Sequence, residues 1–399
     1  MPIHSRPSCS KGLQTRGANC AARLVGLAAA TWCAAALAAP WRPTDDSVVL
    51  AAVPARGINL TLESAERDYR AHPDDVAILE RLVREQLAAG RRLSDPRYFG
   101  QAEAVLARAL SLSQRSLTLD ISWADILQHR HDYEASRRVL DRVLSTAPRE
   151  PQARLMRAQM NLAQGRFAEA RRDCTALLTV GAVGRVCLAQ AMTMTGDLER
   201  GYALALREAT GGGNPATRSW ILTALADMAA RRGDPDSQQW LEKALLADPD
   251  DQYARLALAD ALIDRGALGA AARVAGAGPQ SDAALLRLAI VATASGGGDA
   301  AARELEARHR EATARGEVIH LRDLARFRLE VLHDVHGALE AARRNFASQK
   351  EPWDARLLLE SARAAGDLGA VAEYRAWQRT TGYQDRRLAS LAVAAPEAG

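Results

Sequence analysis

The chain has 399 residues, of which 48% are hydrophobic, 25% are charged and 5% are aromatic. Alanine, leucine, arginine and glutamate dominate, and strand-forming runs of valine, isoleucine and threonine are absent, so we expect an almost entirely helical, all-α protein. The formal net charge of +4 comes from four cations that precede Ala39, and the remainder has 48 basic and 48 acidic side chains. This balance argues against a nucleic-acid partner, because binding to phosphate backbones needs a surplus of cations.

The segment 1–38 has the features of a secretory signal peptide. Four cations and no acidic residue precede an apolar run over residues 24–39, and residues 36–38 read Ala-Leu-Ala. A basic start, a short apolar run and an Ala-x-Ala end are typical of a signal that is cleaved, here after Ala38. A retained anchor is the alternative, but a membrane span needs roughly 20 apolar residues. We therefore predict a signal peptide over 1–38, no transmembrane helix in the mature chain, and export to the periplasm, with secretion or peripheral attachment to the envelope left open.

Two cysteines remain after this segment is removed. Cys174 falls in the second helix of one predicted helix pair and Cys187 in the first helix of the next. In an exported protein such a pair invites a disulfide, which would join two helix pairs. The alternative is that both are small buried hydrophobic residues.

In chain order, a first helix is predicted over 60–71. His72-Pro73-Asp74-Asp75 ends it and supplies the N-cap of the next helix. Residues 76–89 read as the first half of a two-helix unit, and an enlarged turn over 90–97 separates it from a second half that begins near Phe99.

The stretch over 117–182 holds two copies of one unit. Ala124 recurs as Ala158 and Tyr133 recurs as Phe167, each after about 34 residues, which is a known period of helix–turn–helix repeats. In each copy the small alanine precedes a short turn, and the aromatic residue opens a second apolar run. A unit of this length and order resembles the tetratricopeptide repeat. The resemblance implies a right-handed superhelical α-solenoid, in which each unit packs on its neighbours and the protein acts by binding.

The same unit recurs more weakly on both sides of this stretch. Asp234-Pro235 reads as the start of a second helix, with aspartate as the N-cap and proline as the first helical residue. About eight repeats are expected. The predicted organisation is a flexible leader over 39–59 and a solenoid over 60–394, with repeats near 76–112, 117–148, 151–180, 183–210, 219–249, 252–276, 282–309, 318–350 and 352–378, and a capping helix over 383–394.

Signatures of catalysis are missing from the sequence. It contains no Gly-x4-Gly-Lys-Ser/Thr, no His-Glu-x-x-His, no Cys-x-x-Cys and no Gly-x-Ser-x-Gly motif. We therefore predict no enzymatic activity, no cofactor and no metal. His129 and His131, with Asp132, offer metal-ligand types at a turn, and His333 and His336 form a second pair. Ordinary polar turn residues are the favoured interpretation of both pairs: His129 and His131 are two apart and would point away from each other on a helix, and the second pair lies at another predicted bend.

The family resemblance also implies that the first helices of the repeats line a concave groove. In each repeat the small alanine, such as Ala124 or Ala158, is expected where the two helices cross, and we call it the crossing alanine. The residue after each crossing alanine and the residue one turn later point into this groove. Tryptophan or tyrosine near the helix starts can anchor a partner, with Trp123 and Trp353 as further candidates. The predicted partner-binding residues are Asp125, His129, Gln159, Gln190, Asp227, Arg231, Asp260, Asp264, Trp220 and Tyr253.

These residues would form a polar, mildly acidic groove for an extended peptide or a helix. The first helices that carry them contain no lysine, so the carboxylate clamp of chaperone-tail-binding family members is not expected. We predict an exported scaffold or adaptor that binds another protein of the cell envelope. The alternatives are an adaptor for envelope polysaccharide or another non-protein ligand, a solvated face that contacts nothing specific and, least favoured, an enzyme of unknown type.

Overall fold

A computed structural model describes residues 60–111, 115–314 and 320–392. The predicted signal peptide over 1–38, the leader over 39–59 and the last two residues of the predicted cap lie outside these ranges. Within them the chain is helical and contains no strand, which confirms the expected all-α helical repeat fold. No helix in the described ranges is long and apolar enough to span a membrane.

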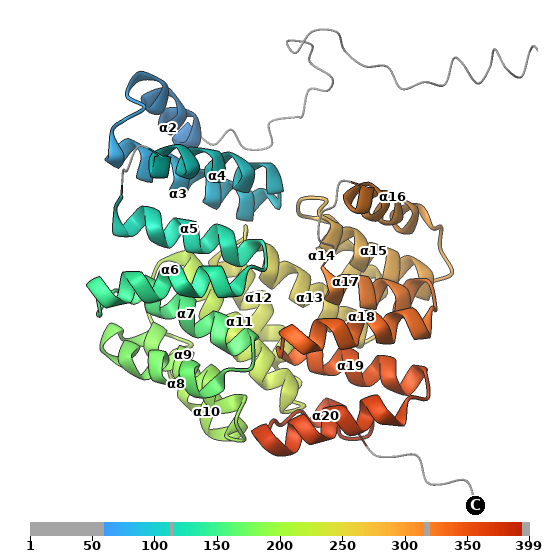
Figure 1. Cartoon of the computed structure of the whole chain (residues 1–399). Helices are drawn as coiled ribbons and strands as arrows, with labels where there is room; N and C mark the ends of the chain where they lie inside the picture. The colour runs from blue at the N-terminus through green and yellow to red at the C-terminus, as the bar shows by residue number, and fades with distance from the viewer. Residues whose placement is uncertain (1–59, 112–114, 315–319, 393–399) are drawn as a thin grey trace, which may run out of the picture. The chain divides into compact units, whose positions relative to one another are not determined.

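After the first helix, consecutive helices pack against each other as separate pairs along the chain (Figure 1). A single helix, α2 (Leu60–Ala71), precedes nine pairs in the described part of the chain. The pairs are α3 (Val76–Leu93) with α4 (Pro96–Ser111), α5 (Leu117–His129) with α6 (Tyr133–Thr146), α7 (Pro151–Ala163) with α8 (Phe167–Ala176), α9 (Ala182–Thr193) with α10 (Leu198–Leu206), α11 (Pro215–Arg231) with α12 (Ser237–Ala247), α13 (Gln252–Asp264) with α14 (Leu268–Gly276), α15 (Asp282–Ala294) with α16 (Ala300–Ala314), α17 (Leu321–Arg326) with α18 (Val335–Ser348), and α19 (Pro352–Ala364) with α20 (Leu368–Thr381). Short helices follow α8 (η1, Leu177–Val180), α17 (η2, Phe327–Val331) and α20 (η3, Arg386–Leu388).

The turn inside each pair has one residue with a positive φ. A left-handed residue ends a helix by turning the chain away from its axis, and glycine adopts this conformation without steric cost. Ser94, His131 and His333 replace glycine in three of the turns, so these residues have a backbone conformation that most residues avoid. The nine residues are Ser94, His131, Gly165, Gly196, Gly233, Gly266, Gly296, His333 and Gly366.

The crossing alanines of the sequence pattern are buried between helices. Ala124, Ala158, Ala189 and Ala259 are fully buried, and Ala226 is 3% exposed. At the first crossing the Ser136 hydroxyl donates a hydrogen bond to the Ala124 carbonyl at 2.7 Å. Such contacts require a small side chain at the crossing.

Replacing Ala158 by tryptophan should lower the free energy of unfolding by about 2 kcal/mol or more, because the added ring has no space in a filled core. Ala158 belongs to a buried apolar cluster that includes Leu162 and Phe167. Urea unfolding followed by circular dichroism measures the change. Ala168→Trp is the control, since Ala168 is exposed on α8 and its replacement should leave stability nearly unchanged. Equal stability of the two variants would show that the crossing position is assigned wrongly.

Three predicted boundaries are wrong. Helix α3 continues to Leu93, so most of the turn expected over 90–97 is helical. Gly90 serves packing: a Cβ there would lie 2.6 Å from Cε2 of Phe99. Helix α12 begins at Ser237, not at Asp234-Pro235, because Asp234 Oδ1 accepts the Asp236 amide in a turn of its own. In place of the expected capping helix, the described chain after α20 forms only the short η3.

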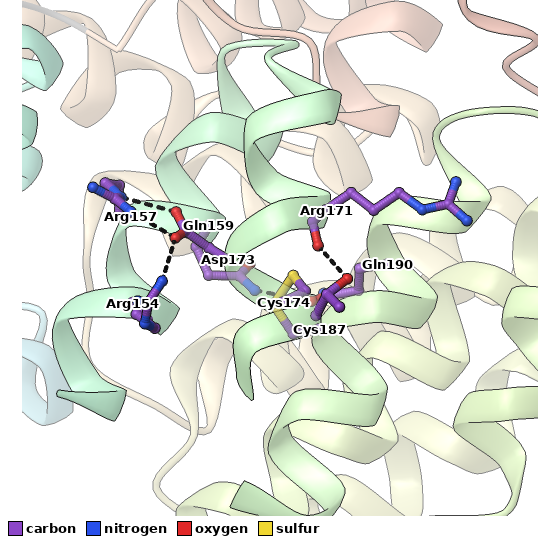
Figure 2. Close-up of a disulfide and its surroundings, with 9 residues drawn as sticks. Arg154, Arg157, Gln159, Arg171, Asp173, Cys174, Cys187 and Gln190 are labelled. Atoms are coloured by element: carbon purple, nitrogen blue, oxygen red, sulfur yellow. Dashed lines mark hydrogen bonds and ion pairs between the residues drawn. A yellow bond between two sulfur atoms is a disulfide. The ribbon is translucent and has the colours of Figure 1, made fainter. Parts of the chain in front are cut away.

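Cys174 of α8 and Cys187 of α9 form a disulfide (Figure 2). Both cysteines are fully buried, and their Cα atoms lie 5.2 Å apart. Next to the bridge, buried Asp173 accepts hydrogen bonds from Arg154 and Arg157 of α7 (Figure 2). The bridge therefore joins two successive helix pairs at a point where the first pair is also held by ion pairs.

Helices far apart in the sequence also contact each other. The turns of the pairs from α5 to α12 contact residues 320–388, and we call this set of contacts the seam. One buried apolar cluster spans it and unites Ala158 and Leu162 of α7 with Phe346 of α18 and Leu358 of α19. Polar contacts along the seam are His131 Nε2 with His320 Nδ1 at 2.9 Å, the Lys350 amide donating to the Ala163 carbonyl at 2.6 Å, the Leu198 amide donating to Gln384 Oε1 at 3.4 Å, and Arg386 Nη1 donating to the Arg232 carbonyl at 3.0 Å.

Candidate functional site

The predicted groove residues of α5, α7 and α9 contact the neighbouring repeat. Asp125 accepts a hydrogen bond from Arg91 Nη1 at 2.6 Å. Gln159 Nε2 donates to Gln190 Oε1 at 2.9 Å. These side chains are partly exposed and their polar groups bond within the chain, so they bridge successive first helices.

Two predicted groove residues, Arg231 and Asp260, are buried, which corrects their assignment to an exposed groove surface. Arg231 is 2% exposed. Its Nη1 donates to the Thr193 carbonyl at 3.1 Å, its Nη2 to the Thr193 hydroxyl at 2.7 Å, and its Nε to Asp227 Oδ2 at 3.0 Å. Arg231 therefore ties α11 to the end of α9.

Asp260 is 4% exposed and lies between two arginines. Arg287 Nη2 donates to Oδ2 at 2.8 Å, and Arg326 Nη1 donates to Oδ1 at 2.9 Å. Burial alone would raise the pKa of Asp260, but the two guanidinium groups outweigh it and hold the pKa below its usual value of 3.8. Asp260 is thus a charged link between α13, α15 and α17.

Trp353 and Arg356 of α19 extend this link. The guanidinium carbons of Arg326 and Arg356 each lie 4.4 Å from the centre of the Trp353 ring, within cation–π distance. Arg356 in turn donates to both oxygens of Asp264, at 2.6 and 2.8 Å. Helices α17 and α19, the first helices of the last two pairs, therefore contact α13. They cover part of the face that was predicted to be an open groove.

A cavity of about 300 Å³ remains between these elements. Its walls are residues of α11 and α13, the turn between α11 and α12, the first part of α12, Trp353 of α19 and Arg387 of η3. Of the ten predicted groove residues, four line it, namely Asp227, Asp260, Asp264 and Tyr253. The other six do not. Small side chains of α11 and α13, Ala226, Ala230, Ala257 and Ala261, form most of its apolar wall.

Tyr253 is the most accessible large side chain of the cavity wall, at 68% exposed. It makes no hydrogen bond to any residue in the described ranges. The walls around it nevertheless raise the pKa of its hydroxyl, because they displace bulk water from the concave site. Trp220, the other predicted anchor, instead packs half-buried against an apolar cluster of α9–α11 that contains Val186 and Leu225. Tyr253 is therefore the predicted aromatic anchor that lies where a ligand can reach it.

Sequence reasoning missed the arginines that close the groove. Arg287, Arg326 and Arg356 lie 27, 66 and 92 residues from their aspartate partners. The repeat pattern indicates contacts between neighbouring units, which is where the Arg287 pair lies, but it does not indicate the contacts of Arg326 and Arg356 with units further away. Trp353 was among the candidate anchors, but its ring already contacts two guanidinium groups.

The predicted histidine pairs have different surroundings. His129 stacks on Phe99 with ring centres 3.7 Å apart. His131 lies at the seam, where its Nδ1 is 2.7 Å from the Tyr133 hydroxyl and its Nε2 faces His320. His333 is exposed at the turn before α18, and His336 is exposed in the first turn of α18. In the described part of the chain no three His, Cys, Asp or Glu side chains are placed to share a metal ion.

His131 should make stability depend on pH. Burial lowers its pKa to about 4, with a smaller effect from His320 and His129. An unfolded histidine titrates near 6.5, so between about pH 6.5 and 4 the unfolded state binds a proton that the folded state refuses, and stability falls as the pH falls. Asparagine tolerates the left-handed turn. His131→Asn should therefore lose less stability than the wild type between pH 7 and pH 5, measured as urea midpoints.

The control for this prediction is His72→Asn, because His72 is exposed at the end of α2. That variant should keep the pH dependence of the wild type. If His131→Asn also keeps it in full, the histidine contact at the seam does not govern acid stability.

Comparison with known proteins gives a likeness in fold alone. No protein-family model matches the chain, and no curated protein matches its sequence. Similar solved structures include a tetratricopeptide repeat protein from Parabacteroides merdae (11% identity, 75% of this chain and 90% of that chain, TM-score 0.34), the human IFIT1 dimer with PPP-AAAA (13%, 80% and 94%, 0.44) and yeast Tom70 (10%, 82% and 81%, 0.37). At these TM-scores the likeness carries no argument about ligands.

Proposed function

We propose that this protein is an exported scaffold that binds a segment of another envelope protein in the cavity between α11, α13 and α19. The observation that carries the proposal is Tyr253, a large aromatic side chain that is 68% exposed in the wall of a concave, mostly apolar cavity. Exposed tyrosines in concave sites are frequent anchors of protein interfaces. The proposal assigns no catalytic step to the chain.

Two observations support export. The segment 1–38 has the order of a secretory signal, and the chain contains a disulfide between Cys174 and Cys187. Disulfides of this kind persist in oxidising compartments and are rare in the cytosol. Mass spectrometry of the protein isolated from its own cells should give an N-terminus at Ala39. An N-terminus that retains residues 1–38 would contradict export by cleavage of this signal.

Protein binding is favoured over polysaccharide binding by the state of the aromatic rings. Sugar binding would use stacked, accessible aromatic faces. In the cavity wall Trp353 already contacts Arg326 and Arg356, which leaves Tyr253 as the exposed ring.

Site-specific photocrosslinking tests the proposal. A photoreactive phenylalanine analogue is placed at position 253 and, as the matched control, at Leu246, which is 82% exposed on the second helix α12. In cells that produce the protein, irradiation should yield a protein adduct from position 253 and none from position 246. No adduct at 253, or equal adducts at both positions, would contradict the cavity as the binding site.

A further inference from the structure

Each of the two cations that line the cavity, Arg265 and Arg387, makes two hydrogen bonds within the chain. Arg265 Nη1 donates to Gln238 Oε1 at 3.0 Å, and its Nη2 donates to the Pro235 carbonyl at 2.6 Å. Arg387 donates from Nε and Nη2 to the two oxygens of Asp385, at 3.0 and 2.7 Å. Both arginines therefore brace the wall, and Arg387 has a carboxylate partner within the chain, whereas the contacts of Arg265 are to neutral groups.

The carboxylates of the cavity differ in how many of their oxygens are engaged. Asp260 and Asp264 each accept from arginines at both oxygens. Asp227 differs: Oδ2 accepts from Arg231 Nε, while Oδ1 has no donor in the described part of the chain. The Asp227 side chain is 40% exposed, and Tyr253 has an unbonded hydroxyl in the same cavity. A half-exposed carboxylate oxygen and a phenol beside an apolar wall suit a ligand that carries donors on a long apolar stem.

We infer that the cavity takes an arginine side chain of the protein partner, with Asp227 as its counter-ion and Tyr253 as the ring on which the guanidinium stacks. This inference rests on the proposed function. Arginine fits better than lysine, because its planar guanidinium stacks on an aromatic face and donates in two directions at once. Its methylene stem lies along Ala226, Ala230 and Ala257, as long charged side chains do on apolar surfaces.

A pair of peptides tests the ligand chemistry. The probes are acetyl-Ala-Ala-Arg-Ala-Ala-amide and the same peptide with citrulline, which keeps the shape and removes the charge. Isothermal titration of the full disulfide-bonded chain should show binding of the arginine peptide that is about tenfold tighter than binding of the citrulline peptide. Asp227→Asn should remove that preference, and Asp299→Asn, at an exposed carboxylate between α15 and α16, should keep it.

Folding of the Asp227 variant needs its own check, because Asp227 also bonds buried Arg231. Asparagine retains an oxygen that can accept from Arg231 Nε, and circular dichroism verifies the helical content. Tyr253→Ala provides a second variant whose exposed side chain contributes little to the core. Tyr253→Ala should weaken the binding of the arginine peptide and leave the urea midpoint of unfolding unchanged.

The outcomes separate this inference from the proposed function. Equal binding of both peptides, or no binding of either, overturns the arginine assignment, and an adduct at position 253 would then show that a partner binds through other chemistry. Discrimination by the wild type that is lost in Asp227→Asn, together with loss of the adduct in that variant, supports it. If the arginine peptide binds but the adduct at 253 survives in Asp227→Asn, the partner does not use this contact and the inference fails.

Discussion

Replacing Asp260 by alanine is expected to lower the free energy of unfolding by about 3–5 kcal/mol, because it removes the buried carboxylate between Arg287 and Arg326 and leaves them only their outer partners, Asp323 and Glu330. The side chains of Arg326 and Arg287 are only 2% and 11% exposed, so water cannot take the place of the carboxylate. Equilibrium urea unfolding followed by circular dichroism at neutral pH measures the loss. For the same reason, substitutions at Asp260 are unsuitable as probes of binding.

Asp264→Ala is the matched control for this prediction. Its carboxylate also pairs with an arginine of a distant helix, Arg356, but its side chain is 36% exposed. Exposed ion pairs contribute roughly 1 kcal/mol or less. The loss should therefore be clearly smaller than for Asp260→Ala. Equal losses in the two variants would mean that burial of the Asp260 pair is not the source of its stabilising effect.

The ion pairs of Asp260 should also make the free energy of unfolding depend on pH in the acid range. The pKa of Asp260 is lowered in the folded state, with the guanidinium groups outweighing burial. Its contribution to stability is therefore complete above the usual carboxyl pKa of 3.8 and is lost as the pH falls below that value. The variant without Asp260 lacks this part of the acid dependence.

Removing the disulfide should lower the free energy of unfolding by roughly 3 kcal/mol, as expected from the loop entropy of a short closed segment. The bridge closes a sequence separation of 13 residues. Cys174→Ala with Cys187→Ala tests it, and both sites tolerate a small apolar side chain because they are fully buried. The expected result is a lower urea midpoint with unchanged helical content.

Reduction of the wild-type chain separates the cross-link from the packing of the two side chains. The reduced and oxidised forms have the same sequence, so any difference in their urea midpoints comes from the bond. Identical midpoints in the presence and absence of reductant would contradict a stabilising role of the bridge.

The local parts of the fold could be predicted because they depend on near neighbours in the sequence. A buried small residue such as Ala158 and a left-handed glycine such as Gly165 recur once in each unit, and both follow from how two successive helices cross and turn. The helix ends were less predictable. Gly90 and Pro235 both resemble turn signals. Gly90, however, lies inside α3, where the absence of a side chain leaves space for the Phe99 ring.

The sequence indicated the cavity residues of α11 and α13, but it did not indicate the distant helices that cover part of them. Asp227 and Tyr253 face the cavity as expected from their place in the repeat. Asp260 occupies the same kind of position, yet it is buried by Arg326, 66 residues away. Whether a groove stays open depends on the small rotation between successive units summed over many repeats, and that sum is not encoded in any one spacing.

The seam changes how this repeat protein should unfold. A solenoid whose units touch only their neighbours behaves as a one-dimensional array and frays from its ends. Here His131 contacts a residue 189 positions further along the chain. Glu199, near the start of α10, accepts a hydrogen bond from a residue 187 positions further along. Because the last helices support the middle ones, losing either end removes contacts throughout. The chain from α5 to η3 should accordingly melt as one cooperative body, not unit by unit.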